Sequence, residues 1–83
     1  MTIHISAKFD GSDLAHHASF NYNCIESYVL TNKELFVNAA IKVLKEKCVN
    51  YFLVDFATMC FVEVYYFDKD RKEVNLFRKE KVK

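Results

Sequence analysis

The sequence contains no proline and only one glycine, Gly11, among its 83 residues. A phosphate-binding loop needs several glycines, because backbone amides must approach the phosphate closely, so a nucleotide site of this kind is excluded. No linker rich in proline or glycine and no internal repeat divides the chain. Its length suits one globular domain over residues 1–83, with a basic C-terminal end that can fray.

Cysteine is also scarce, and its three copies, Cys24, Cys48 and Cys60, are widely spaced among apolar neighbours. A secreted disulfide scaffold carries an even and denser set, so we expect buried free thiols in a reducing cytoplasm. The N-terminus lacks the basic leader and apolar core of a signal peptide. Neither sign of charge is in excess, since the chain has twelve basic and eleven acidic side chains, and this balance favours neither a DNA mimic nor an obligate nucleic-acid binder.

The longest apolar stretch covers residues 51–67 and is interrupted only by Asp55, Thr58 and Glu63. We expect no membrane helix here, because an aspartate at the middle of such a helix costs roughly 2.5–3.5 kcal/mol to insert. The stretch is far longer than a usual strand of about five or six residues, so we expect a break between Asp55 and Thr58. The strand itself then covers about 59–67 and is apolar on both faces apart from Glu63.

Strict alternation of apolar and polar side chains predicts two further strands, over residues 2–9 and 17–24. A polar turn at residues 68–72 separates the strand at 59–67 from a last strand over 73–79, which predicts a hairpin. All four strands are thus expected to belong to one antiparallel sheet.

A helix is predicted to begin at Thr31, because Thr31 and Glu34 form a T-x-x-E capping box with Leu30 and Leu35 as the accompanying hydrophobic pair. Residues 25–30 before it are ambiguous and can prolong the second strand through a bulge. Apolar residues recur at helical spacing on the face expected to pack against the sheet: Val37, Ala40, Ile41, Leu44 and Cys48.

The order β-β-α-β-β predicts a small two-layer α+β domain, in which one helix packs on one face of an antiparallel sheet of about four strands. A five-residue turn at 68–72 places aliphatic side chains of the hairpin toward the helix, and aromatic rings mixed with charges on the opposite face. Aromatic anchors ringed by polar groups are typical of recognition surfaces. The candidate partner-binding residues are Phe61, Glu63, Tyr65, Phe67, Phe77 and Lys79. The alternative is that residues 10–30 or the C-terminal tail cover this face.

Candidate metal-binding and catalytic residues give weaker indications of function. Asp10, Asp13, His16 and His17 supply two carboxylates and two imidazoles within eight residues, but a loop does not ensure that they converge, and a solvated turn is the simpler interpretation. We find no catalytic motif, since a reactive Cys–His pair needs an accessible thiol of lowered pKa. No enzyme activity, metal or cofactor is therefore expected.

The favoured hypothesis is a non-catalytic, cytoplasmic protein-interaction module that binds another protein or its own copy as a homodimer. By analogy of size only, such a chain could be a phage- or mobile-element-encoded inhibitor of host machinery, as anti-CRISPR proteins are. The alternative is a nucleic-acid-binding protein that stacks bases on the aromatic face and uses the basic C-terminal end for phosphates. Glu63 and Glu73 on that face, and the lack of a Gly-aromatic signature, oppose it.

Overall fold

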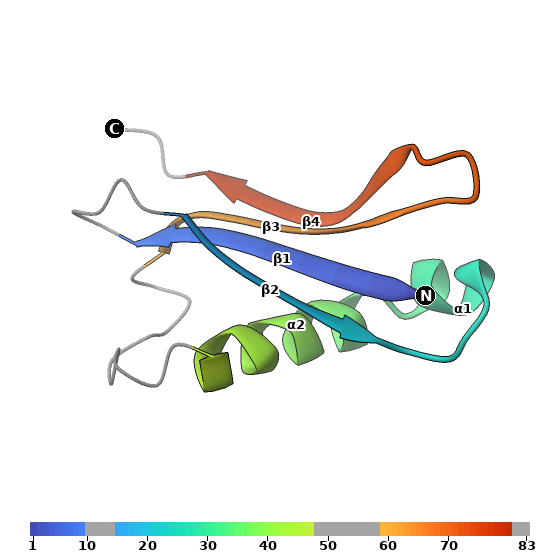
Figure 1. Ribbon diagram of the computed structural model, residues 1–83, viewed down its shortest axis with the longest axis horizontal. Coiled ribbons are helices and arrows are strands. Elements are labelled where there is room, and N and C mark those ends of the chain that lie inside the picture. The colour runs from blue at the N-terminus through green and yellow to red at the C-terminus, as the bar shows by residue number, and fades with distance from the viewer. Residues whose placement is uncertain (10–14, 48–58, 81–83) are drawn as a thin grey trace.

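The computed structural model describes residues 1–9, 15–47 and 59–80 of the chain. Its four strands form one antiparallel sheet in the order β2-β1-β3-β4, and both helices pack on the same side of it (Figure 1). The predicted α+β fold is confirmed. The elements in chain order are β1 Thr2–Phe9, β2 Ala15–Asn21, α1 Glu26–Thr31, α2 Lys33–Lys47, β3 Met59–Phe67 and β4 Glu73–Glu80.

The hydrophobic core lies between the sheet and the two helices. Alternate side chains of the central strands β1 and β3 point into it, as the period of two in the sequence requires. None of the helices in the described parts of the chain is long and apolar enough to cross a membrane. The fully buried residues with the largest side chains are Tyr66, Phe36, Ile3, Ile5, Leu44, Val29, Val62 and Val64.

The predicted capping box is wrong, because the chain is already helical before Thr31. Thr31 is the last residue of α1, and its hydroxyl donates a hydrogen bond of 2.8 Å to the carbonyl of Ser27, one turn earlier. Asn32 separates the two helices, and its carbonyl accepts the amide of Phe36 in the first turn of α2. Residues 26–31 are therefore a short helix rather than a continuation of β2.

The residues of α2 that face the core also differ in part from the predicted ones. Phe36, Ala40 and Leu44, spaced four residues apart, are fully buried, whereas Val37 and Ile41 are only partly buried. Phe36 packs edge-on against two tyrosine rings that precede α2, those of Tyr22 and Tyr28, at 5.1 and 5.9 Å between ring centroids. Leu30 and Leu35, the hydrophobic pair predicted for the helix start, are 40% and 53% exposed. Cys48 lies outside the described residues.

The turn between β3 and β4 forms where the sequence predicts it. One carboxylate oxygen of Asp68 accepts the backbone amides of Asp70 and Lys72 at 2.8 and 2.9 Å. Arg71 adopts a left-handed conformation with φ of 62°, which closes the turn. Phe67 and Glu73 are the first paired residues on either side.

A bulge in β4 changes the register beyond this turn. Tyr65 pairs with Asn75, but Val64 pairs with Phe77, so Leu76 is an extra residue. Since one added residue shifts the alternation, the side chains of Phe77 and Lys79 lie on the helix side of the sheet. Their predicted place on the opposite face is wrong.

Candidate functional site

The side chains that point away from both helices form one continuous surface, which we call the open face. Phe61, Glu63, Tyr65 and Phe67 lie on it as predicted, because they alternate with the buried residues of β3. Arg78 and Glu80 occupy the places expected for Phe77 and Lys79. The open face consists of Thr2, His4, Ser6, Lys8, Ala15, His17, Ser19, Asn21, Phe61, Glu63, Tyr65, Phe67, Glu73, Asn75, Arg78 and Glu80.

Residues 15–30 do not cover the open face, contrary to one alternative left by the sequence. Residues 15–21 form the edge strand β2, and α1 packs on the opposite side of the sheet through Val29. The remaining parts of that alternative, residues 10–14 and the tail at 81–83, lie outside the described residues.

Three rings at one end of the open face form what we call the aromatic cluster: His4, Tyr65 and Phe67. His4 stacks on Tyr65 with 5.3 Å between ring centroids and an angle of 19° between planes. Phe67 meets both rings edge-on, at 5.6 Å from each. Phe67 is 51% exposed, so the cluster presents an apolar surface to solvent. His4 joins it because β1 lies beside β3 and pairs His4 with Tyr65.

The other end of β3 carries a second ring with charged neighbours. The guanidinium of Arg78 lies 5.7 Å from the ring centroid of Phe61, a cation–π contact, and its nitrogen is 3.6 Å from a carboxylate oxygen of Glu80. Lys8 pairs with Phe61 from the neighbouring strand. Both Arg78 and Glu80 are well exposed, so their ion pair contributes little to folding and is available to a partner.

Glu63 lies between these two ends and has a perturbed carboxyl group. Burial raises its pKa above the ordinary value of 4.5, and the charge of Glu73 and a hydrogen bond between the two carboxyl groups raise it further. The positive charge of Arg78, which pairs with Glu63 across the strands, opposes this shift only in part. The centre of the open face therefore carries a carboxyl group that is costly to ionise.

Replacing Glu63 with glutamine is expected to raise the melting temperature near neutral pH. The folded state binds the Glu63 proton more tightly than the unfolded chain does. The protonated carboxyl therefore stabilises the folded state fully below pH 4.5, and this stabilisation is lost as the pH rises through the raised pKa. Thermal denaturation at several pH values should show the variant gaining on the wild type as the pH rises. Glu46→Gln, on the exposed side of α2, is the control for the loss of one carboxyl group. A Glu63→Gln curve parallel to the wild type would contradict the prediction.

Ser6 and His17 form a hydroxyl–imidazole pair that sequence reasoning missed. The Ser6 hydroxyl oxygen lies 2.7 Å from Nδ1 of His17, within reach for activation of a nucleophile. The two residues are direct cross-strand partners in β1 and β2, which accounts for their contact without a catalytic role. We assign no reaction to this pair, and the absence of catalysis stays a prediction.

The metal hypothesis receives no support from the described residues. Asp10 and Asp13 lie outside them, and within residues 1–9, 15–47 and 59–80 no three His, Cys, Asp or Glu side chains are grouped to hold an ion. Cys24 and Cys60 are free thiols that are half-buried rather than fully buried as predicted. Cys60 faces the Lys8 carbonyl, with 3.5 Å between sulfur and oxygen.

The charges of the open face are mixed. Two basic residues, Lys8 and Arg78, share it with Glu63, Glu73 and Glu80. Lys79, on which the nucleic-acid alternative partly depends, lies on the other side of the sheet. This balance does not favour a phosphate backbone, which requires a basic surface.

The open face is thus a sheet surface with an aromatic cluster at one end and a cation–π pair at the other. The chain matches no protein-family model, no curated protein and no solved structure.

Proposed function

We propose that this protein is a non-catalytic interaction module whose open face binds a protein surface. The observation that carries the proposal is the aromatic cluster, in which three rings contact one another at the sheet surface while Phe67 stays half exposed. Exposed aromatic rings within a polar surround are the usual anchors of protein interfaces, because they bury large apolar areas at low cost in side-chain entropy. The suggestion of a phage-encoded inhibitor stays an analogy of size.

A second copy of the chain is the occupant that the charges favour. Glu73 pairs with Phe67 at one end of β3, and Lys8 pairs with Phe61 at the other. Glu73 lies on β4 and Lys8 lies two strands away on β1, so a two-fold axis that lies in the interface and is inclined to the perpendicular of the strands sets Glu73 of one copy over Lys8 of the other. The same arrangement buries both aromatic clusters in one closed, symmetric contact.

Self-association should therefore depend on the exposed rings. Tyr65→Ala and Phe67→Ala are each expected to weaken dimerisation by about 2 kcal/mol or more, roughly 30-fold in the dissociation constant. Sedimentation equilibrium over a range of protein concentrations measures this change. Because Phe67 already faces solvent, its truncation should leave the melting temperature nearly unchanged. Lys42→Ala, on the exposed side of α2, is the matched control and should change neither quantity.

Exchanging the charges of Glu73 and Lys8 tests this dimer against other partners of the open face. Glu73→Lys and Lys8→Glu should each weaken the dimer, and the double variant should recover it. A strict monomer of 9.8 kDa at all concentrations would remove the second copy as the occupant. A sharp loss of melting temperature in Phe67→Ala without a change in association would show that the rings belong to the core. Tight binding of single-stranded RNA at physiological salt, lost in Arg78→Ala, would replace the proposal with the nucleic-acid alternative.

A further inference from the structure

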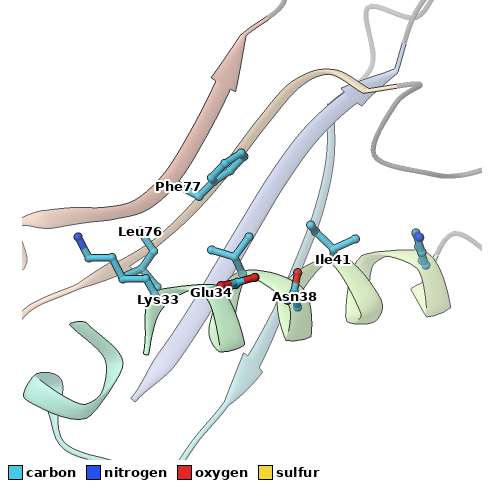
Figure 2. Close-up of a pocket in the computed structure, with 8 residues that line it drawn as sticks. Lys33, Glu34, Asn38, Ile41, Leu76 and Phe77 are labelled. Carbon is cyan, nitrogen blue, oxygen red and sulfur yellow. The ribbon is translucent and has the colours of Figure 1, made fainter. Parts of the chain in front are cut away.

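A second surface, independent of the open face, lies on the helix side of the sheet between α2 and β4. The helix packs mainly against β2 and β1, so the helix side of β4 is left partly uncovered. The resulting groove has a volume of about 570 Å³ and is lined by side chains of both elements (Figure 2). Its lining residues are Lys33, Glu34, Val37, Asn38, Ile41 and Lys45 of α2, and Leu76 and Phe77 of β4.

The bulge in β4 supplies one wall of this groove. Leu76 and Phe77 are adjacent in sequence, yet both side chains line the groove, because the extra residue lets two successive side chains point toward the helix. In Figure 2 the Phe77 ring lies above the helix at the level of Glu34. The apolar floor thus combines two residues of β4 with Val37 and Ile41 of α2.

The helical wall has a regular order of charge and apolarity. Lys33, Val37, Ile41 and Lys45 are each four residues apart, so they form one stripe along α2. The helix rises 1.5 Å per residue, which sets the two lysines about 18 Å apart along its axis. Glu34, beside Lys33, is the one acidic residue among the described residues of the lining. The stripe is apolar in the middle and positive at both ends.

The strand beside the groove, β4, can pair with an added β-strand. β4 is an edge strand of the sheet, and within the described residues it pairs only with β3. The outer edge of such a strand presents amide and carbonyl groups without a ladder partner. An extended peptide added to this edge would direct every second side chain into a groove that lies between the strand and a helix.

We propose that the groove between α2 and β4 binds an extended peptide segment that adds to β4 as a fifth strand. Two apolar side chains at alternate positions of the segment fill the groove over Val37 and Ile41, and an acidic residue at each end meets Lys33 and Lys45. The spacing fits a seven-residue segment, since its first and seventh residues are about 20 Å apart at 3.4 Å per residue. The partner is thus a peptide of the pattern acidic-x-apolar-x-apolar-x-acidic, and no residue of the open face takes part.

The test uses a synthetic heptapeptide with blocked ends, Glu-Ser-Leu-Ser-Leu-Ser-Glu, titrated into the isotopically labelled full chain. We expect amide shifts in the NMR spectrum to concentrate on β4 and on the groove side of α2. The peptide Glu-Ser-Ser-Leu-Leu-Ser-Glu has the same composition without the alternation, and N-methylation of the central residues removes backbone donors. Both control peptides should bind at least tenfold more weakly.

A charge-reversal variant tests both the binding site and the direction of the bound peptide strand. Lys45→Glu is expected to weaken binding of the peptide about tenfold. Lys45 is exposed in the last turn of α2, so its reversal should lower the melting temperature only slightly, through the helix dipole. Two further peptides carry lysine in place of the first or of the last glutamate. Only the peptide whose lysine lies beside residue 45 should restore the affinity for Lys45→Glu, and its identity shows in which direction the bound strand runs. Absence of binding at millimolar peptide, equal binding of the rearranged peptide, indifference to Lys45→Glu, or shifts confined to the open face would each overturn the proposal. The dimerisation experiments are unaffected by any of these outcomes.

Discussion

Replacing Phe36 with alanine is expected to lower the free energy of unfolding by about 3–5 kcal/mol, as measured by urea denaturation. The side chain is only 1% exposed and packs edge-on against the rings of Tyr22 and Tyr28. Its removal leaves a cavity where β2, α1 and α2 meet, and the flanking rings cannot refill it without losing their own contacts. Small domains have a total stability of about 5–15 kcal/mol, so the variant should be close to unfolding.

Leu35 provides a matched control for this substitution. It is an adjacent apolar residue on the same helix, but 53% of its surface is exposed. Leu35→Ala should therefore change the free energy of unfolding by no more than about 0.5 kcal/mol. Equal costs at the two positions would contradict the orientation of α2, because adjacent helical residues point about 100° apart.

Tyr66 should give the second large effect, with about 3–5 kcal/mol lost in Tyr66→Ala. The residue is fully buried in β3, and its hydroxyl donates a hydrogen bond of 2.9 Å to a carboxylate oxygen of Glu26 in α1. Burial first, and then the hydrogen bond and charge of Glu26, raise the pKa of Tyr66 to about 12. The protonated Tyr66 hydroxyl therefore stabilises the folded state fully below pH 10, and this stabilisation is lost only as the pH rises toward 12.

Tyr66→Phe separates the hydrogen bond from the packing of the ring. Since Glu26 remains exposed and can bind water instead, we expect this variant to cost only about 1 kcal/mol. Combined with Glu26→Ala it should cost less than the sum of the two single changes, since both remove the same bond. If Tyr66→Phe were as destabilising as Tyr66→Ala, the ring itself would contribute nothing, and the assignment of Tyr66 to the core would be wrong.

The strands were predictable because their alternation reports a local property, the half-buried surface of a sheet. β1 and β3 match the predicted 2–9 and 59–67. β2 ends three residues before the predicted end although the alternation continues, because its last residue, Asn21, pairs with Thr2, the first residue of β1. Beyond that pair, the carbonyl of Met1 accepts the amide of Tyr22. The end of a strand thus depends on the length of its partner.

The features that the sequence did not predict depend on tertiary contacts. Tyr28 and Val29 suit a strand locally, and residues 26–31 become helical where Val29 enters the core and Glu26 accepts the hydroxyl of Tyr66. The bulge at Leu76 has no local signal except two successive apolar residues. For this reason four of the six candidate partner-binding residues lie on the open face, and two, Phe77 and Lys79, lie on the helix side.

The central position of β1 has a consequence for synthesis of the chain on the ribosome. β1 is made first, but one of its two neighbours, β3, does not begin until Met59. At about 5–20 residues per second, the β3 side of β1 waits for several seconds without its partner. During that time a nascent chain ending before β3 presents an unpaired strand with the apolar side chains of Ile3 and Ile5, which other nascent chains can bind. Correct folding of this small domain therefore depends on its C-terminal hairpin arriving before such a contact forms.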